Sequence, residues 1–240
     1  MAIALILSGG SGTRLGSDIP KQYIKVYDRR VISYCIERVC GHAGIDGIQI
    51  VAAPQWHGTI QECMQQYDKN GKFRGFSAPG ENRQLSIYNG LADIRKYADD
   101  SDTVLIHDAA RPLLSEQMIT QCLKAVQGHD GVVPVLPMKD TVYRSVDGRK
   151  ISALVSRSEI YAGQAPEAFK IGAYHEANRV LFPDKILTIN GSTEPAVMAG
   201  LDMVMISGDE GNFKITTPED LERLREIVKK QKEEERYPEG

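Results

Sequence analysis

Residues 3–23 read IALILSGGSGTRLGSDIPKQY, a short apolar run followed at once by a loop with four glycines and two cations. The apolar run Ile3–Leu7 predicts a buried β-strand. Glycines allow backbone N–H groups to approach an anion closely, and a glycine-rich turn between a strand and a helix often holds phosphate. The stretch therefore predicts an α/β fold with a phosphate site after its first strand.

Two common phosphate-binding loops do not match this stretch. The Walker loop ends in lysine followed by serine or threonine, whereas this loop offers Gly12-Thr13-Arg14. The dinucleotide fingerprint would start at Gly10 and require glycine at Leu15, and Asp28 is a weak candidate for its acidic ribose ligand. The sequence thus argues against nicotinamide binding.

The two cations of the loop suggest a polyphosphate ligand. Arg14 can grip phosphate oxygens with two parallel hydrogen bonds, and Lys21 adds a point charge whose placement Pro20 restricts. The alternative is a pair of solvated surface cations beside an unrelated turn. The formal net charge of the chain, 29 − 32 = −3, favours a local anion site and argues against a nucleic-acid partner.

Further along the chain, apolar runs alternate with amphipathic segments. The pattern predicts strands over Ile3–Leu7, Ile48–Ala53, Thr103–His107 and Gly131–Pro137, and helices over Val31–Cys40, His57–Tyr67, Gln84–Tyr97 and Glu116–Val126. Such alternation is typical of a Rossmann-like, doubly wound and mostly parallel sheet in the α/β class. Ligands of such sheets lie at the carboxyl ends of the strands.

The pattern changes after Met138, where two β-rich segments flank Asp147-Gly148, a strong hairpin signal. We interpret residues 138–166 as a protruding arm within a single domain of residues 1–240; an antiparallel edge of the main sheet is the alternative. A last helix is predicted with Thr217 as N-cap, Pro218 at its first position and a frayed tail over 231–240.

Composition places the protein among ordinary globular chains, with 42% hydrophobic and 25% charged residues. No stretch approaches the roughly 20 apolar residues that span a bilayer, and the first residues lack the features of a signal peptide. The four cysteines have no metal-site spacing and fall in apolar segments, which indicates reduced core residues. We expect a cytoplasmic protein without a membrane partner.

The glycine-rich loop resembles the signature loop of nucleotidyltransferases, and its "PKQY" is similar to the branch that makes CDP-linked polyols from CTP. Other segments resemble the same branch: "PGENRQLSIYNGL", "VLIHDAARP", "MKDTVYR", "LVSRSEIYAGQAPEAF" and "NFKITTPEDL". From Ala4 to about Leu224 the chain resembles the family of 2-C-methyl-D-erythritol 4-phosphate and ribitol-5-phosphate cytidylyltransferases.

The resemblance implies an enzyme that joins CTP and a polyol phosphate, releasing pyrophosphate. It implies Mg²⁺ as cofactor and a homodimer in which the arm completes the partner's site. The implied catalytic residues are Arg14, Lys21 and Lys214; the nucleotide-binding residues are Leu7, Ser8, Gly9, Gly10, Ser11, Gly12, Thr13, Gly80, Glu81, Arg83 and Ser86; the acceptor-binding residues are Asp108, Arg111, Thr141 and Arg157. Asp108 is also the candidate metal ligand, because Mg²⁺ usually binds one carboxylate plus substrate oxygens.

The chain departs from the methylerythritol pattern near the expected acceptor. Asn190-Gly191 stands where Thr-Asp is usual, and Ala165-Pro166-Glu167 stands where Thr-Pro-Gln is typical. "YAGQ" is more similar to the ribitol-phosphate branch, and "HDAARP" and "KDTVYR" to the methylerythritol branch. Methylerythritol phosphate is the first choice, with ribitol 5-phosphate or another wall or capsule polyol phosphate as alternative. Two other functions are alternatives: an enzyme that transfers a different nucleotide, and a non-catalytic regulator that binds a nucleotide.

Overall fold

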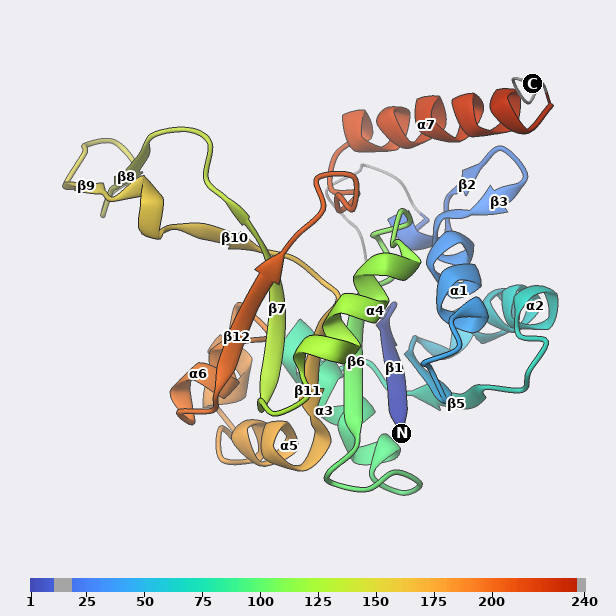
Figure 1. Ribbon diagram of the computed structural model, residues 1–240, viewed down its shortest axis with the longest axis horizontal. Helices are drawn as coiled ribbons and strands as arrows, with labels where there is room; N and C mark the ends of the chain where they lie inside the picture. The colour runs from blue at the N-terminus through green and yellow to red at the C-terminus, as the bar shows by residue number, and fades with distance from the viewer. Residues whose placement is uncertain (11–18, 237–240) are drawn as a thin grey trace.

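The computed structural model describes residues 1–10 and 19–236, and its centre is a mixed sheet (Figure 1). Within the described residues, eight strands form this sheet in the order β10-β7-β11-β6-β1-β4-β5, with β12 also paired to β7. The strands are β1 (Ala2–Leu7), β4 (Gly47–Val51), β5 (Phe73–Ser77), β6 (Thr103–Asp108), β7 (Gly131–Pro137), β10 (Tyr161–Gly163), β11 (Glu167–Lys170) and β12 (Met203–Ser207).

The strand order contains the switch at which a doubly wound sheet binds its ligands. From β1 the chain moves outward through β4 to β5, and it then returns to β6 on the other side of β1. Strand β1 pairs in parallel with both β4 and β6. Strands β10 and β11 run antiparallel to their neighbours, so the sheet is mostly but not wholly parallel.

Helices cover both faces of the sheet. One face packs against α1 (Val31–Gly41), α2 (His57–Tyr67) and α4 (Glu116–Ala125), with residues such as Ile36, Ile60 and Ile119 in one apolar cluster. The other face packs against α3 (Arg83–Ile94), α5 (Ile171–Arg179) and the short α6 (Glu194–Met198). The first turn of α3 lies at the switch between β1 and β6, because its first residue, Arg83, contacts Asp108 at the end of β6.

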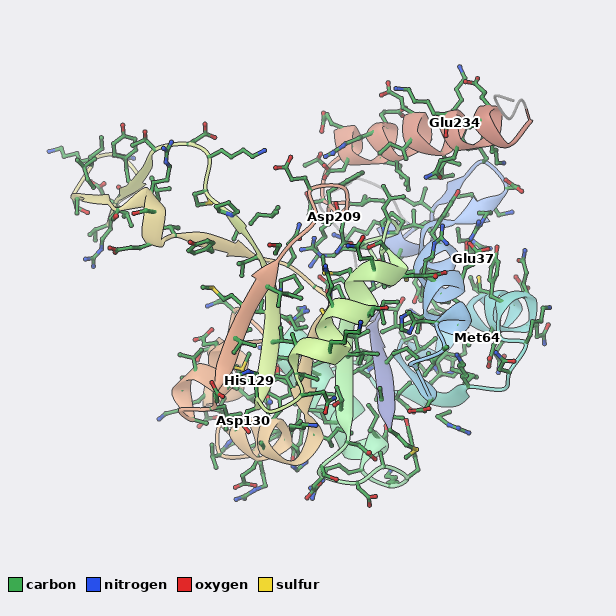
Figure 2. The ribbon with its side chains drawn as sticks, in the orientation of Figure 1. Glu37, Met64, His129, Asp130, Asp209 and Glu234 are labelled. Carbon is green, nitrogen blue, oxygen red and sulfur yellow. The ribbon has the colours of Figure 1, made fainter. Side chains whose placement is uncertain are left out.

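Two elements project from this layered body (Figure 1). Strands β8 (Val142–Arg144) and β9 (Ala153–Val155) form a small hairpin well away from the main sheet. Helix α7 (Pro218–Arg236) packs over the segment that contains the short strands β2 (Lys25–Val26) and β3 (Arg29–Arg30). Figure 2 shows Asp209 just beyond the carboxyl end of β12, while His129 and Asp130 lie at the opposite end of the sheet.

The α/β class, the four predicted strands, the four predicted helices and the hairpin are confirmed. Asp147-Gly148 forms its turn, with Gly148 in the left-handed region at φ +69°. The prediction that the chain frays from residue 231 was wrong over residues 231–236, because α7 continues to Arg236. The cysteines Cys35, Cys40, Cys63 and Cys122 are free and buried, as predicted.

Helix α7 begins as its sequence predicts. The Asp220 carboxylate accepts hydrogen bonds from the backbone N–H groups of Thr216 and Thr217, and the Thr217 hydroxyl accepts one from Asp220 N–H. This reciprocal cap satisfies N–H groups that a helix start leaves without partners. No helix in residues 1–10 or 19–236 has the length and apolar character needed to cross a membrane.

Candidate active site

A cavity of about 450 Å³ opens at the carboxyl ends of β1 and β6, beside the first turn of α3. It lies at the switch point of the sheet, where the sequence predicts the ligand. The cavity is lined by Leu7, Gly9, Gly10, Lys21, Gln22, Gly80, Glu81, Asn82, Arg83, Ser86, Asp108, Ala110, Lys214 and Thr216.

The short 3₁₀ helix η2 (Lys21–Tyr23) is hydrogen-bonded to the segment that follows β1. The side-chain amide of Gln22 donates to the carbonyl oxygens of Ser8 and Gly10, at 2.9 Å each. The Ser8 hydroxyl donates to the Tyr23 hydroxyl at 2.7 Å. These bonds tie the start of the glycine-rich loop to the helix that carries Lys21, so backbone donors and the cation are placed together.

A second loop, which follows β5, forms the adjacent wall of the cavity. A Cβ added to Gly9 would lie 2.7 Å from Cβ of Pro79, so glycine permits the two loops to touch. The Ser86 hydroxyl accepts the Gly80 N–H at 2.9 Å and donates to the Asn82 carbonyl at 2.9 Å. Asn82 caps α3 by accepting the Leu85 N–H at 2.8 Å.

Asp108 is the centre of the charge arrangement in the cavity. One carboxylate oxygen lies 3.1 Å from Nε of Arg83, and the other lies 3.0 Å from Nζ of Lys214 and 3.6 Å from Nε of Arg111. Burial disfavours ionisation of Asp108, but the charges of Arg83, Lys214 and Arg111 outweigh it and hold its pKa well below the usual range. The carboxylate is therefore fixed and ionised, and it gathers cations from three parts of the chain.

Beneath this cluster a buried polar network supports Arg111. Nη1 of Arg111 donates to the Asn212 carbonyl at 2.7 Å, and Nε2 of His107 donates to the Arg111 carbonyl at 3.0 Å. Burial lowers the pKa of His107 to about 4, so its ring is neutral at neutral pH. The Asn212 amide in turn donates to the Ala165 carbonyl at 2.7 Å. Arg111 is thus held rigidly in place.

The cavity brings together ten of the residues singled out in the sequence: Leu7, Gly9, Gly10, Lys21, Gly80, Glu81, Arg83, Ser86, Asp108 and Lys214. The Ser8 side chain is bonded to Tyr23 and is not part of the lining, and Arg111 lies behind Asp108. Thr141 and Arg157 belong to the arm, where Arg157 donates to the Lys139 carbonyl at 2.8 Å. Ser11, Gly12, Thr13 and Arg14 lie outside the described residues.

Sequence reasoning missed four lining residues: Gln22, Asn82, Ala110 and Thr216. Asn82 carried a usable signal, because asparagine just before an amphipathic segment is a preferred helix cap. Gln22 is the neighbour of Lys21, which the sequence singled out. Its hydrogen bonds to the Ser8 and Gly10 carbonyls, however, are visible only in the folded chain.

The residues present suit Mg²⁺ poorly at Asp108. No group of three or more His, Cys, Asp or Glu side chains in the described parts of the chain could hold a metal ion. Glu81 and Asp108 supply the carboxylates among the lining residues, and Asp108 already faces three cations. A metal ion there would meet the repulsion of Lys214 and Arg83. The prediction of Asp108 as metal ligand therefore gains no support from this geometry.

Comparison with known proteins agrees with the geometry of the cavity. The family model described as 2-C-methyl-D-erythritol 4-phosphate cytidylyltransferase (IspD) matches residues 2–230. A ribitol-5-phosphate cytidylyltransferase of Lactiplantibacillus plantarum is 29% identical over 96% of this chain and 99% of its own length. A 2-C-methyl-D-erythritol 4-phosphate cytidylyltransferase of Nitrosomonas eutropha is 31% identical over 94% of this chain and 95% of its own.

A solved structure shares the fold. The 4-diphosphocytidyl-2C-methyl-D-erythritol synthase of Anaerococcus prevotii superposes with a TM-score of 0.80 at 24% identity, covering 95% of this chain and 96% of that one. The family match spans nearly the whole chain and includes every described residue that lines the cavity. The chain belongs to the IspD family, and it is a CTP-dependent cytidylyltransferase.

Proposed function

We propose that this enzyme transfers the cytidylyl group of CTP to 2-C-methyl-D-erythritol 4-phosphate, giving the CDP-linked polyol and pyrophosphate, a step of isoprenoid biosynthesis. The observation that carries the proposal is the arrangement at the end of β6, where Asp108 of "HDAARP" is ion-paired with both Arg111 of that segment and Lys214. This segment resembles the methylerythritol branch.

The reaction needs little proton transfer, which fits the side chains of the cavity. The second pKa of a phosphomonoester is near 6, so the acceptor phosphate is mostly a dianion at neutral pH and attacks without a general base. Its oxygen forms a bond to the α-phosphorus of CTP while the bond between that phosphorus and the bridging oxygen of pyrophosphate breaks. The obstacle is repulsion between two anions, which fixed cations and N–H donors reduce.

The cations of the cavity are assigned by their positions. Lys21 and the backbone N–H groups of Gly9 and Gly10 would hold the triphosphate, together with Arg14, and stabilise pyrophosphate as it leaves. Lys214 would neutralise the α-phosphate as charge develops there, since Asp108 already holds its ammonium over the cavity. Arg83 would contact the nucleotide, and Arg111 would lower the repulsion of the acceptor phosphate.

We also propose that the enzyme is a homodimer in which the arm of one subunit supplies Thr141 and Arg157 to the acceptor of the other. The arm exposes Tyr143, Val146, Ile151, Leu154 and Tyr161, at 52%, 84%, 64%, 73% and 43% of their surface. All but Tyr161, which lies in β10, belong to the projecting hairpin, and exposed apolar side chains gathered in this way are typical of an association surface. Mg²⁺ stays a prediction; it would take its ligands mainly from substrate oxygens and water.

Ribitol 5-phosphate is the second candidate acceptor. Its support is the 29% identical ribitol-5-phosphate cytidylyltransferase and the residues Asn190, Gly191 and Glu167, which depart from the methylerythritol pattern. That acceptor would place the enzyme in the synthesis of a cell-surface polymer.

A competition experiment tests the proposal. The enzyme is given CTP, Mg²⁺ and equal amounts of both polyol phosphates, and the CDP-linked product is identified by its mass. We expect CDP-methylerythritol to dominate. Dominant CDP-ribitol would replace the proposal by the second candidate, and no CDP-linked product from either polyol phosphate would exclude both acceptors.

A further inference from the structure

Glu167 is a buried carboxylate beside the cavity that the proposed mechanism does not use. It is the first residue of β11 and lies opposite Ile106 in the antiparallel ladder with β6. Residues directly opposite in such a ladder share a face, as do residues two apart in one strand. Glu167 and Asp108 therefore project from the same face of the sheet, the face that α3 covers.

The first residue of α3 lies between these two carboxylates. Nε of Arg83 is 3.1 Å from one oxygen of Asp108, and Nη2 is 3.9 Å from Oε2 of Glu167. The Arg83 guanidinium is thus shared by two anions that come from neighbouring strands. Nε donates a hydrogen bond to Asp108 and Nη2 is ion-paired with Glu167, so the orientation of the planar guanidinium toward the cavity depends on both partners.

Glu167 is also bonded to the segment that departs from the methylerythritol pattern. The Ser192 hydroxyl donates a hydrogen bond to Oε2 of Glu167. The Ser192 carbonyl accepts the Tyr174 hydroxyl at 2.5 Å, and that hydroxyl accepts the Gln84 amide at 3.0 Å. Through these contacts the segment around Ser192 is linked to the first turn of α3, which carries Arg83.

Glu167 adds a second negative charge beside Arg83. Asp108 faces the cations Arg83, Arg111 and Lys214, and Glu167 supplies a second negative charge on the far side of Arg83. Burial raises the pKa of Glu167, and the positive charge of Arg83 opposes that rise. Because Glu167 is only 7% exposed, its attraction for Arg83 is weakly screened by water.

We propose that Glu167 is a positioning residue for cytidylyl transfer: its charge holds Arg83 between two carboxylates and so fixes the position of Asp108 and Lys214. With a neutral residue at this position, Arg83 would shift toward Asp108 alone and compete more strongly with Lys214 for that carboxylate. Lys214 would then be less well aligned with the α-phosphate, whose charge develops only during reaction. The effect belongs to the transition state and appears in kcat.

The test is Glu167→Gln, which keeps the shape and the oxygen that accepts from Ser192 but removes the charge. We expect kcat to fall about tenfold, KM for CTP to stay within about twofold, and the melting temperature to change by less than about 3 °C. Glu176→Gln, at an exposed glutamate that pairs with Arg179 on α5, is the matched control and should behave as wild type. Rates are measured with CTP and whichever polyol phosphate turns over, so failure of the methylerythritol proposal leaves this test intact.

A double-mutant cycle separates positioning from packing. If Glu167 acts through Arg83, the kcat losses of Glu167→Gln and Arg83→Lys are not additive. Ser192→Ala, which frees the Glu167 carboxylate, should lower kcat in the same direction, and it serves as the second variant if Glu167→Gln does not fold. Wild-type kcat in folded Glu167→Gln, additive losses, or a fall in kcat that simply follows a fall in melting temperature would each overturn the proposal.

Discussion

Nζ of Lys214 lies 3.0 Å from Oδ2 of Asp108, which joins the segment before α7 to the carboxyl end of β6. The contact places the ammonium over the cavity before any substrate binds. If the triphosphate binds as proposed, it competes with Asp108 for the same cation, so Asp108 would both orient Lys214 and limit its attraction for the ground state. A cation used mainly in the transition state is the arrangement that raises kcat.

Lys214→Ala removes that charge while leaving the fold nearly intact, because the Lys214 side chain is 34% exposed. We expect turnover to fall at least a hundredfold, since removing one preorganised donor costs about 3 kcal/mol of transition-state stabilisation. Lys21→Ala should act in the same direction. Pyrophosphate release and thermal unfolding are measured together, with exposed Lys124→Ala on α4 as control. Near-normal turnover of folded Lys214→Ala would remove this lysine from the mechanism.

The buried His107 predicts a dependence of stability on pH. Burial lowers its pKa to about 4 in the folded protein, whereas an unfolded histidine titrates near 6.5. Between these values the unfolded chain binds more protons, so stability is full above pH 6.5 and falls by about 3 kcal/mol as the pH drops to 4. Glu167, whose pKa is raised, acts with the opposite sign within part of this range.

The measurement is the free energy of unfolding by urea between pH 7 and 4. His107→Gln retains a donor for the Arg111 carbonyl and should flatten the pH dependence, even if its stability at pH 7 is lower. His129→Gln, at a partly exposed histidine paired with Asp202, should keep the wild-type slope. Equal slopes for wild type and His107→Gln would contradict the assignment.

Much of the fold could be predicted because the inner strands and amphipathic helices carry clear periodicity. Strand β5 was missed since its sequence, FRGFS, contains an arginine and Gly75 and only its last residue is buried. Strands β10 and β11 span three and four residues, too short for a periodic signal. Both strands pair with β7, so their positions depend on contacts between distant parts of the chain that the local sequence does not reveal.

The candidate site was predictable where its residues follow strand ends or match family segments. Asp108 directly follows the predicted strand Thr103–His107 and is the last residue of β6, so its place at the switch point could be predicted from the sequence. Glu167 could not be located in this way, because its approach to Arg83 depends on the register of β11 against β6. The hydrogen bond of the Ser8 side chain likewise depends on Tyr23, which lies 15 residues further along the chain in η2.

Leu154, 73% exposed on the arm, tests the proposed dimer. Leu154→Glu places a charge where we expect a partner subunit, so the protein should sediment as a monomer and lose acceptor turnover while still binding CTP. Sedimentation velocity and calorimetric titration with CTP provide the measurements. Val180→Glu, at an exposed valine just after α5, is the control. An unchanged dimer, or a wild type that is monomeric, would contradict the arm's role.

The cap of α7 links stability to the position of Lys214. Asp220 accepts from both backbone and hydroxyl of Thr216, at 2.8 Å each, and Thr216 lines the cavity two residues after Lys214. Asp220→Ala should cost about 1 kcal/mol of stability, as loss of a helix cap usually does. It should also lower kcat by a few fold, because the segment that carries Lys214 loses its anchor. Asp220→Asn, which keeps an oxygen acceptor, should recover most of both losses; if it recovers stability but not kcat, the charge rather than the cap is what matters for Lys214.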